Sequence, residues 1–154
     1  MSINSIRTLI EDAAITHPEK KAIVFNEDSI SYKELLKKVD QVAYYLNELD
    51  LPKESRIGIY SNKGIEQVIA ILAILSTPYI LVPLTKLLKS EQIQYIIDDC
   101  DIKCIISDKV QLETIEEINF NGHIISYETA SSDIASFEEI FKYYNKPYSC
   151  DVNG

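Results

Sequence analysis

The chain has 154 residues, of which 46% are apolar and 25% are charged, and its formal net charge is −9. An apolar share this large excludes intrinsic disorder, and the acidic balance argues against a nucleic-acid partner, which would need clustered lysine and arginine. A chain of this length is expected to form one domain.

The first predicted elements are a hairpin and a long helix. Two short predicted strands, residues 22–25 and 29–31, flank the turn-forming triplet Asn-Glu-Asp, a pattern typical of a β-hairpin. Ser31 and Glu34 then have the spacing of a capping box, and apolar residues recur at three- and four-residue steps as far as Leu49. The spacing predicts an amphipathic helix that ends before Pro52.

The middle of the chain alternates strands with helices. Residues 56–60 predict a strand, and Asn62 can cap a following helix whose apolar positions extend to Leu75. Residues 79–82 form an uninterrupted apolar run, which is typical of a fully buried strand in a parallel sheet. Ser90 can cap the next helix, which carries isoleucines on one face.

A membrane span is the alternative for one part of this region. The stretch from Val68 to Thr85 contains no charged residue and approaches the length that crosses a bilayer. Ser76, Thr77 and Pro78 divide it, however, into segments too short to span. We therefore expect a buried helix, a turn and a strand, and no membrane span.

The last third of the chain continues the alternation. Residues 103–106 and 123–126 each predict a strand, residues 111–118 predict a weaker helix, and Ser136 with Glu139 forms a second capping box ahead of a final helix. Alternating strands and helices with short connections indicate an α/β fold, in which helices flank a mostly parallel sheet in a Rossmann-like three-layer arrangement.

Two further expectations follow from this fold class. The small N-terminal hairpin should lie outside the order of the main sheet. Five side chains should be buried, namely Leu72, Ile80, Val82, Ile105 and Ile125.

Cysteines and the N-terminus indicate the compartment. Cys100, Cys104 and Cys150 are too few for a disulfide-stapled secreted domain. Glu11 and Asp12 interrupt the apolar run that a signal peptide needs. We therefore expect a reduced, cytoplasmic protein.

Loops that bind phosphate through glycine-rich backbone are not recognisable in this sequence. Such loops need clustered glycines, because backbone N–H groups must approach the anion closely. Gly58, Gly64, Gly122 and Gly154 are isolated and far apart. Neither a Walker loop nor a dinucleotide-binding fingerprint can be built from them.

A cysteine pair and a cluster of three aspartates offer two candidate sites. Cys100 and Cys104 are four residues apart but have no neighbouring ligands, so buried inert thiols are a better interpretation than a zinc site. Asp98, Asp99 and Asp101 cluster at a predicted helix end. This cluster could form a cation or general-base site, but we favour the interpretation that it is a solvated turn.

Histidines and tyrosines offer two more candidates. His17 and His123 lie in no metal-like or triad-like spacing, which favours ordinary surface or strand-end histidines. Tyr143, Tyr144 and Tyr148 could stack on a base, but without basic neighbours they are expected to pack a helix against the sheet. Residue chemistry alone therefore indicates no catalytic, cofactor-binding or metal-binding residue.

Residues 17–23 are similar to a P-x-x-x-A pattern, residues 30–35 to hTYxEL, and residues 72–84 have the spacing of LAxLKAGxxYVPL. Together with residues 90–108, these segments resemble the N-terminal part of the adenylate-forming (AMP-binding) superfamily, which includes acyl-CoA synthetases, adenylation domains of peptide synthetases and luciferases. Residues 90–108 resemble a further segment of the superfamily. The positions that match there are Glu91, Tyr95, Asp98, Lys103 and Asp108.

The sequence departs from these motifs at two places. Ser76, Thr77 and Pro78 stand where the superfamily usually has Lys-Ala-Gly, so proline instead of glycine shapes the turn. Thr85 replaces the Asp or Asn that is common after VPL.

The resemblance implies an ATP-dependent acid–thiol ligase that activates a small carboxylic acid, such as a fatty or amino acid, as acyl-AMP. It would use ATP, Mg²⁺ and coenzyme A or phosphopantetheine. Residues 1–154 would be the N-terminal subdomain, ending before the phosphate-binding loop, and would be inactive and bind no cofactor alone. The partner would be the rest of the enzyme C-terminal to Gly154, and uncovered apolar surface would give a weak homodimer. The alternative is a stand-alone α/β interaction module without catalysis.

Overall fold

The computed structural model describes residues 3–144, which form six helices and two sheets. In chain order the elements are α1 (Ile3–Thr16), β1 (Lys21–Phe25), β2 (Asp28–Ser31), α2 (Tyr32–Glu48), β3 (Arg56–Tyr60), α3 (Ile65–Leu75), β4 (Ile80–Leu84), α4 (Ser90–Cys100), β5 (Ile102–Ser107), α5 (Lys109–Glu116), β6 (His123–Ser126), β7 (Ala135–Ser136) and α6 (Phe137–Tyr143).

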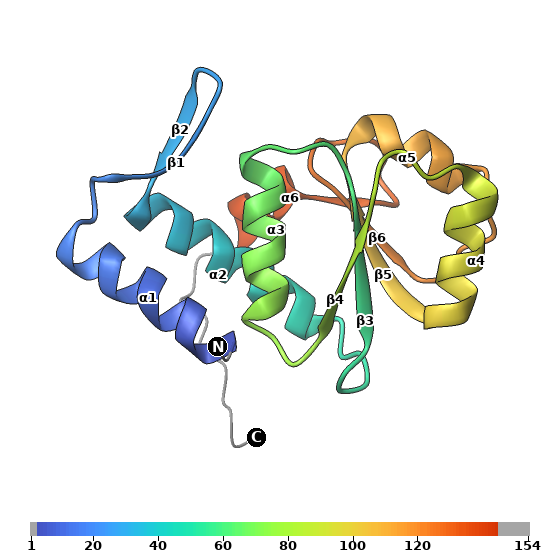
Figure 1. Cartoon of the computed structure of the whole chain (residues 1–154), viewed down its shortest axis with the longest axis horizontal. Coiled ribbons are helices and arrows are strands. Elements are labelled where there is room, and N and C mark those ends of the chain that lie inside the picture. The colour runs from blue at the N-terminus through green and yellow to red at the C-terminus, as the bar shows by residue number, and fades with distance from the viewer. Residues whose placement is uncertain (1–2, 145–154) are drawn as a thin grey trace.

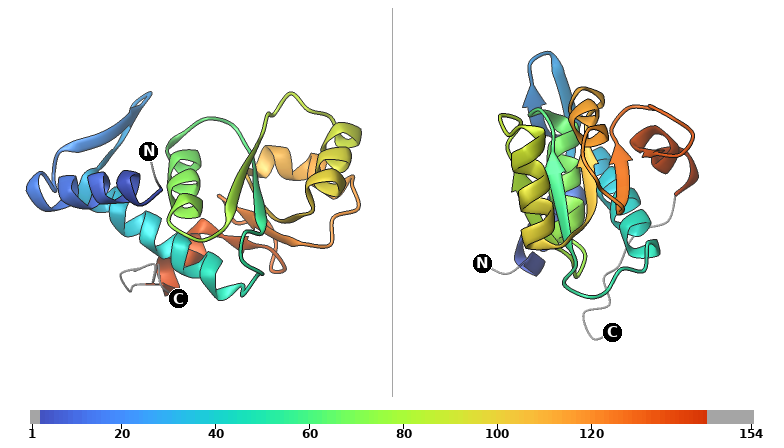
Figure 2. Two further views of the ribbon diagram at one scale, coloured as in Figure 1. Left: turned by 60° about the horizontal axis from the view of Figure 1, so that its bottom comes forward. Right: turned by 90° about the vertical axis from the view of Figure 1, so that its right-hand side faces the viewer.

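The main sheet has the order β4-β3-β5-β6-β7, and all of its neighbouring strands are parallel. Helices α2, α3 and α6 cover one face and α4 and α5 cover the other, as Figures 1 and 2 show. The side chains of β3 point alternately to the two faces of the sheet. Ile57 and Ile59 pack in the core under α2, α3 and α6, and Tyr60 packs in the core under α4 and α5. The expected three-layer α/β fold is confirmed.

The hairpin formed by β1 and β2 is a separate antiparallel sheet. Asn26 adopts a left-handed conformation with φ 55°, as a tight hairpin turn requires. The hairpin projects from α1 and α2, away from the main sheet (Figure 1). The prediction for residues 22–31 is therefore confirmed.

Local capping signals fix the start of two helices. The Ser31 hydroxyl accepts a hydrogen bond from the Glu34 backbone N–H over 3.2 Å at the start of α2. Ser136 accepts in the same way from Glu139, also over 3.2 Å, at the start of α6. Both predicted capping boxes therefore lie at real helix starts.

Two other predicted caps are wrong. Helix α3 begins after Gly64, and Asn62 lies in the preceding loop, where its backbone N–H is bound by Asp108. Ser90 is the first residue of α4 and Lys89 holds the cap position. The Lys89 N–H is satisfied by the Gln92 side chain over 2.9 Å, so this helix start needs no serine hydroxyl.

Burial follows the prediction in the centre of the sheet but not at β4. Ile105 and Ile125 are fully buried, as predicted. Leu72 and Val82 are only partly buried, and Ile80 is 42% exposed, so their predicted burial is wrong. For Ile80 and Val82 the reason is that β4 is an edge strand with β3 as its neighbour on one side, whereas a fully buried strand was expected.

Pro83 is compatible with the position of β4 at the edge of the sheet. Ile80 donates its backbone N–H to the Ser55 carbonyl, on the β3 side. Because successive residues of a strand point their backbone groups to opposite sides, Leu81 and Pro83 direct theirs to the open edge. A proline nitrogen there removes no hydrogen bond from the sheet.

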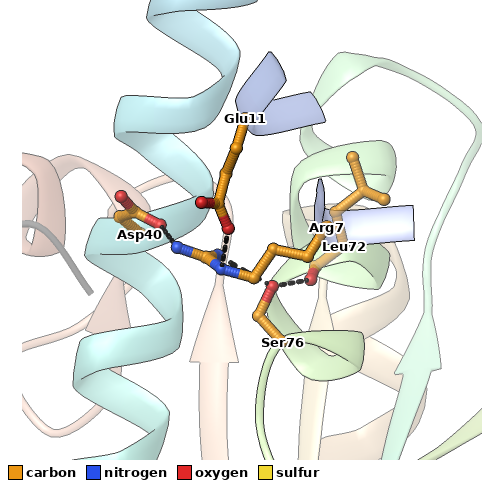
Figure 3. A network of polar contacts seen from close by, with 5 residues as sticks. All are labelled: Arg7, Glu11, Asp40, Leu72 and Ser76. Carbon is orange, nitrogen blue, oxygen red and sulfur yellow. Dashed lines mark hydrogen bonds and ion pairs between the residues drawn. The ribbon is translucent and has the colours of Figure 1, made fainter. Parts of the chain in front are cut away.

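Helix α1 and strand β7 were not predicted from the sequence. Arg7 of α1 reaches between α2 and α3, as Figure 3 shows. Its guanidinium lies 2.6 Å from the Asp40 carboxylate, 2.9 Å from Glu11 and 3.1 Å from the Ser76 hydroxyl. One side chain thus ties α1 to both neighbouring helices.

None of the helices within residues 3–144 is long and apolar enough to cross a membrane. The uncharged stretch from Val68 to Thr85 divides into part of α3, a turn and β4, as expected.

Candidate functional site

The carboxyl ends of β3 and β5 are where this topology favours a site. From β3 the chain passes to β4 on one side of it and then crosses to β5 on the other. In open parallel sheets the loops diverge at such a switch point and leave a crevice there. Ser61 and Asn62 follow β3, and Asp108 follows β5.

Asp108 links the two loops at this point. Its carboxylate accepts a hydrogen bond from the Asn62 backbone N–H over 2.7 Å and from the Gln111 backbone N–H over 2.8 Å. The second contact caps α5. Asp108 is buried, and each of its oxygens already holds a main-chain donor. Its geometry is that of a loop clamp and not of a free general base.

Ser61 and Tyr127 form a second contact at the same edge. Their hydroxyl oxygens are 2.8 Å apart, and both residues are buried. Burial raises the pKa of the Tyr127 phenol far above its usual value near 10, although the hydrogen bond to Ser61 opposes that shift. The phenol is therefore neutral at every physiological pH. The Gln67 amide lies 3.4 Å from the Ser61 hydroxyl and carbonyl oxygens.

The histidines lie away from this edge. His17 is exposed in the segment after α1, and His123 is exposed at the first residue of β6, at the opposite, amino edge of the sheet. Both positions agree with surface or strand-end histidines. Ser61 therefore has no imidazole at hand to activate it as a nucleophile.

The two described cysteines differ in burial. Cys104 is fully buried in β5, and burial raises the pKa of its thiol to about 12. The interpretation as an inert buried thiol is thus confirmed for Cys104. Cys100, at the end of α4, is only partly buried. Cys150 lies outside the described residues.

The aspartates at the end of α4 are exposed. Asp98 accepts a hydrogen bond from Gln94 over 3.2 Å, and Asp101 pairs with Lys103 over 3.2 Å. Asp101 also ends the helix in a left-handed conformation, with φ 51°. This is the geometry of a solvated turn, and residues 3–144 contain no cluster of three or more potential metal ligands.

The C-terminal tyrosines behave differently from one another. Tyr144 packs between Tyr44 and Tyr45 of α2, with ring centroids 5.5 and 5.6 Å away, so it packs against a neighbouring helix and not against the sheet as predicted. Tyr143 is largely exposed, because it lies on the outer side of α6, and the packing prediction is wrong there. Tyr148 lies outside the described residues.

The described glycines are as scattered in space as in sequence. Gly58 lies in the middle of β3, Gly64 precedes α3, and Gly122 packs against the Lys103 carbonyl. Gly64 is the one described glycine at the carboxyl edge, and Gly154 lies outside the described residues. Residues 3–144 therefore contain no phosphate loop built from glycines.

Sequence reasoning missed the cluster formed by Ser61, Asn62, Asp108 and Tyr127. It named Asp108 only as a position in a motif and Asn62 only as a helix cap. The available signal was position, because each of these residues comes directly after a predicted strand or one residue later, and parallel strands end at one edge.

The chain is similar to known proteins over nearly its whole length. Residues 10–147 match the family model described as AMP-binding enzyme. Tyrocidine synthase 1 of Brevibacillus parabrevis is 34% identical over 121 residues, which cover 79% of this chain. The anthranilate CoA ligase AuaEII, in complex with anthranoyl-AMP, superposes with a TM-score of 0.85 at 20% identity over 97% of this chain. A benzoate CoA ligase from Burkholderia xenovorans LB400 gives 0.84 at 17% identity.

These proteins are much longer than this chain. The matched region is 11% of Tyrocidine synthase 1 and 31% of either CoA ligase chain.

Proposed function

Because the chain belongs to the AMP-binding enzyme family, we propose that it is the N-terminal portion of an ATP-dependent acid–thiol ligase. The observation that carries this proposal is the match over residues 10–147 to a family of adenylate-forming enzymes. The similarity to a CoA ligase that holds an acyl adenylate supports it.

The proposed reaction has two steps. A carboxylate oxygen of the acid attacks the α-phosphorus of ATP, the bond to the β-phosphate oxygen breaks, and acyl-AMP and pyrophosphate form. A thiolate then attacks the acyl carbon, and AMP leaves with the electrons of the acyl–oxygen bond. The thiol would belong to coenzyme A or to a phosphopantetheine group, and Mg²⁺ would supply positive charge that neutralises the phosphates.

The described residues do not fit ATP or Mg²⁺. Both oxygens of Asp108 hold backbone donors, and residues 3–144 contain neither a cluster of three metal ligands nor a glycine loop. We therefore assign the phosphate loop, the base-binding wall and the catalytic groups to the part of the enzyme C-terminal to Gly154. Residues 1–154 then serve as its N-terminal subdomain, a scaffold that is inactive alone.

Acid-dependent exchange of pyrophosphate into ATP tests this function. The 1–154 chain and a version extended by the downstream coding sequence are assayed with aromatic acids, fatty acids and amino acids. We expect exchange with one class of acid in the extended protein and none in the 1–154 chain. Exchange by the 1–154 chain would show that the catalytic groups lie within residues 1–154, which would contradict this assignment. An extended protein that is inactive with every acid would favour an interaction module.

A further inference from the structure

Helix α1 lies against α2 and α3, on the side away from the main sheet (Figure 1). Among its described side chains, residues 6–16, none is fully buried and none belongs to either of the two cores. The first turn has no acidic residue and the last turn has no basic one, so charges do not offset the helix dipole. A helix of 14 residues is marginal in water by itself. Helix α1 therefore depends on its contacts with α2 and α3.

The apolar contact beneath α1 is incomplete. A small cavity of about 10 Å³ separates Ile6 and Ile10 of α1 from α2 and α3. The apolar side chains that line it on the other side are Leu36, Val39, Leu72 and Leu75. Atoms that border a gap lose dispersion contacts on that side. Apolar packing thus holds α1 less firmly than it holds the helices that cover the sheet.

Arg7 adds charged contacts to this weak apolar seat. Its guanidinium pairs with Asp40 of α2 over 2.6 Å and donates to the Ser76 hydroxyl, just after α3, over 3.1 Å (Figure 3). Glu11 of α1 pairs with the same guanidinium over 2.9 Å and holds it in place within the helix. The side chains of Arg7 and Asp40 are 14% and 11% exposed, so salt screens their attraction less than it would at the surface.

The contact with Ser76 depends on one of the departures from the superfamily motif. Ser76 stands where that motif has lysine. A lysine ammonium there would be a second cation beside the Arg7 guanidinium and would repel it. The serine hydroxyl instead accepts from Arg7 and donates to the Leu72 carbonyl over 2.8 Å. The position of α1 is therefore coupled to the turn that leads into β4.

The segment after α1 is fixed by other contacts. Lys33 donates its backbone N–H to the Pro18 carbonyl, and Tyr32 donates to the Lys20 carbonyl, each over 3.0 Å. These bonds join residues 18–20 to the start of α2. Helix α1 can therefore leave its seat by a backbone change near residue 17 while the hairpin stays attached to α2.

We propose that α1 is a strap that opens and closes as one unit over α2 and α3, with Arg7 as its latch. Opening breaks the contacts of Arg7 with Asp40 and Ser76 and exposes the apolar side chains beneath α1. The main sheet and its covering helices stay folded, because no described side chain of α1 belongs to either core. Closure then restrains the turn before β4. The inference goes beyond the proposed function and does not depend on it.

Hydrogen exchange of the 1–154 chain under native conditions, followed for each amide by NMR, tests whether α1 opens separately. We expect amides of α1 to exchange faster than those of β3 and β5, because opening of the strap costs less than global unfolding. Ile105→Val weakens the core that stays folded in the open form. It should lower the protection of β3 and β5 about fivefold and leave that of α1 unchanged. An equal loss of protection in α1 would overturn the proposal.

Arg7→Glu tests the latch, because it places a carboxylate opposite Asp40 and Glu11. Amides of α1 should then exchange at least about tenfold faster, whereas β3 and β5 should remain protected. Lys20→Glu makes the same charge change at an exposed position outside α1 and should leave α1 protected. Equal effects of these two variants, or loss of protection throughout the sheet in Arg7→Glu, would overturn the proposal.

Ser76→Ala is a milder test of the same latch. It removes one acceptor of the Arg7 guanidinium and adds no charge. Exchange of the α1 amides should become about fivefold faster, although Ser76 is 69 positions from Arg7 along the chain. Unchanged exchange in α1 would overturn the proposal, because the Ser76 contact would then not hold the strap.

Discussion

Arg7 donates a hydrogen bond to the Asp40 carboxylate over 2.6 Å, and the two side chains are 14% and 11% exposed. The same guanidinium reaches the Ser76 hydroxyl, which in turn donates to the Leu72 carbonyl (Figure 3). Ser76 opens the Ser-Thr-Pro turn that departs from the superfamily motif. This contact therefore joins the N-terminal helix to the turn that leads into β4.

Removal of the Arg7 side chain should lower the free energy of unfolding by about 2 kcal/mol, because Asp40 would lose a charged partner in a largely buried place. Urea unfolding of R7A measures this. Lys103→Ala, which breaks the exposed pair with Asp101, is the control and should cost less than about 0.5 kcal/mol. Equal effects of the two variants would show that the Arg7 contact contributes little.

Asp108→Ala should also destabilise the chain by about 2 kcal/mol, since it removes the cap of α5 and leaves the Asn62 N–H without its partner. Thermal unfolding measures the loss. Asp98→Ala is the comparison, because Asp98 is exposed in the last turn of α4 and opposes the helix dipole. It should be neutral or slightly stabilising. If Asp108→Ala unfolded at the same temperature as the unchanged chain, the inference that Asp108 holds the two loops together would be contradicted.

Gly122 should not tolerate a side chain. A Cβ atom there would clash with both the Lys103 carbonyl oxygen and the Phe120 ring, and backbone cannot yield as a flexible side chain can. Gly122→Ala should cost about 2 kcal/mol in urea unfolding. Gly64→Ala meets its nearest atom, a Glu66 carboxylate oxygen, at 3.4 Å and should cost no more than about 0.5 kcal/mol. The reverse order would contradict the packing around Gly122.

Stability should fall in alkaline solution. Burial raises the pKa of the Cys104 thiol from 9.0 to about 12, so between these values the unfolded chain loses a proton that the folded chain keeps. This favours unfolding by about 1.4 kcal/mol per pH unit from that one group. Urea unfolding at pH 8, 9.5 and 10.5 should show the decline, and Cys104→Ala should make it shallower. A decline that stays unchanged in Cys104→Ala would contradict this origin.

The edge position of β4 predicts unequal costs for two isoleucines. Ile105→Ala, in the central strand β5, should cost about 3 kcal/mol because the side chain is fully buried. Ile80→Ala should cost about 1 kcal/mol, since that side chain is 42% exposed. Urea unfolding of both variants compares them directly. Similar costs would mean that β4 is covered in solution.

The sequence by itself determined most of the local structure of this protein, although helix α1 and strand β7 were not predicted from it. Ser31 and Ser136 mark helix starts because each hydroxyl binds a backbone N–H three residues away, a contact that needs no distant partner. The alternation of strands and helices likewise follows from periodicity within short segments. The hairpin within residues 22–31 follows from its turn residues. Motif order over residues 17–108 was enough to indicate the family.

Only the tertiary structure decided which strand lies at the edge and which loops meet. The apolar run at 79–82 has the same letters whether a strand has one neighbour or two, and strand order arises from contacts between distant segments. Pro83 carried a local signal for an edge, because a proline inside a strand cannot complete a ladder on both sides. The Arg7–Asp40 and Asn62–Asp108 contacts join residues 33 and 46 positions apart. Such pairings are set by the packed fold, which brings the partners together, and not by the spacing of the residues along the chain.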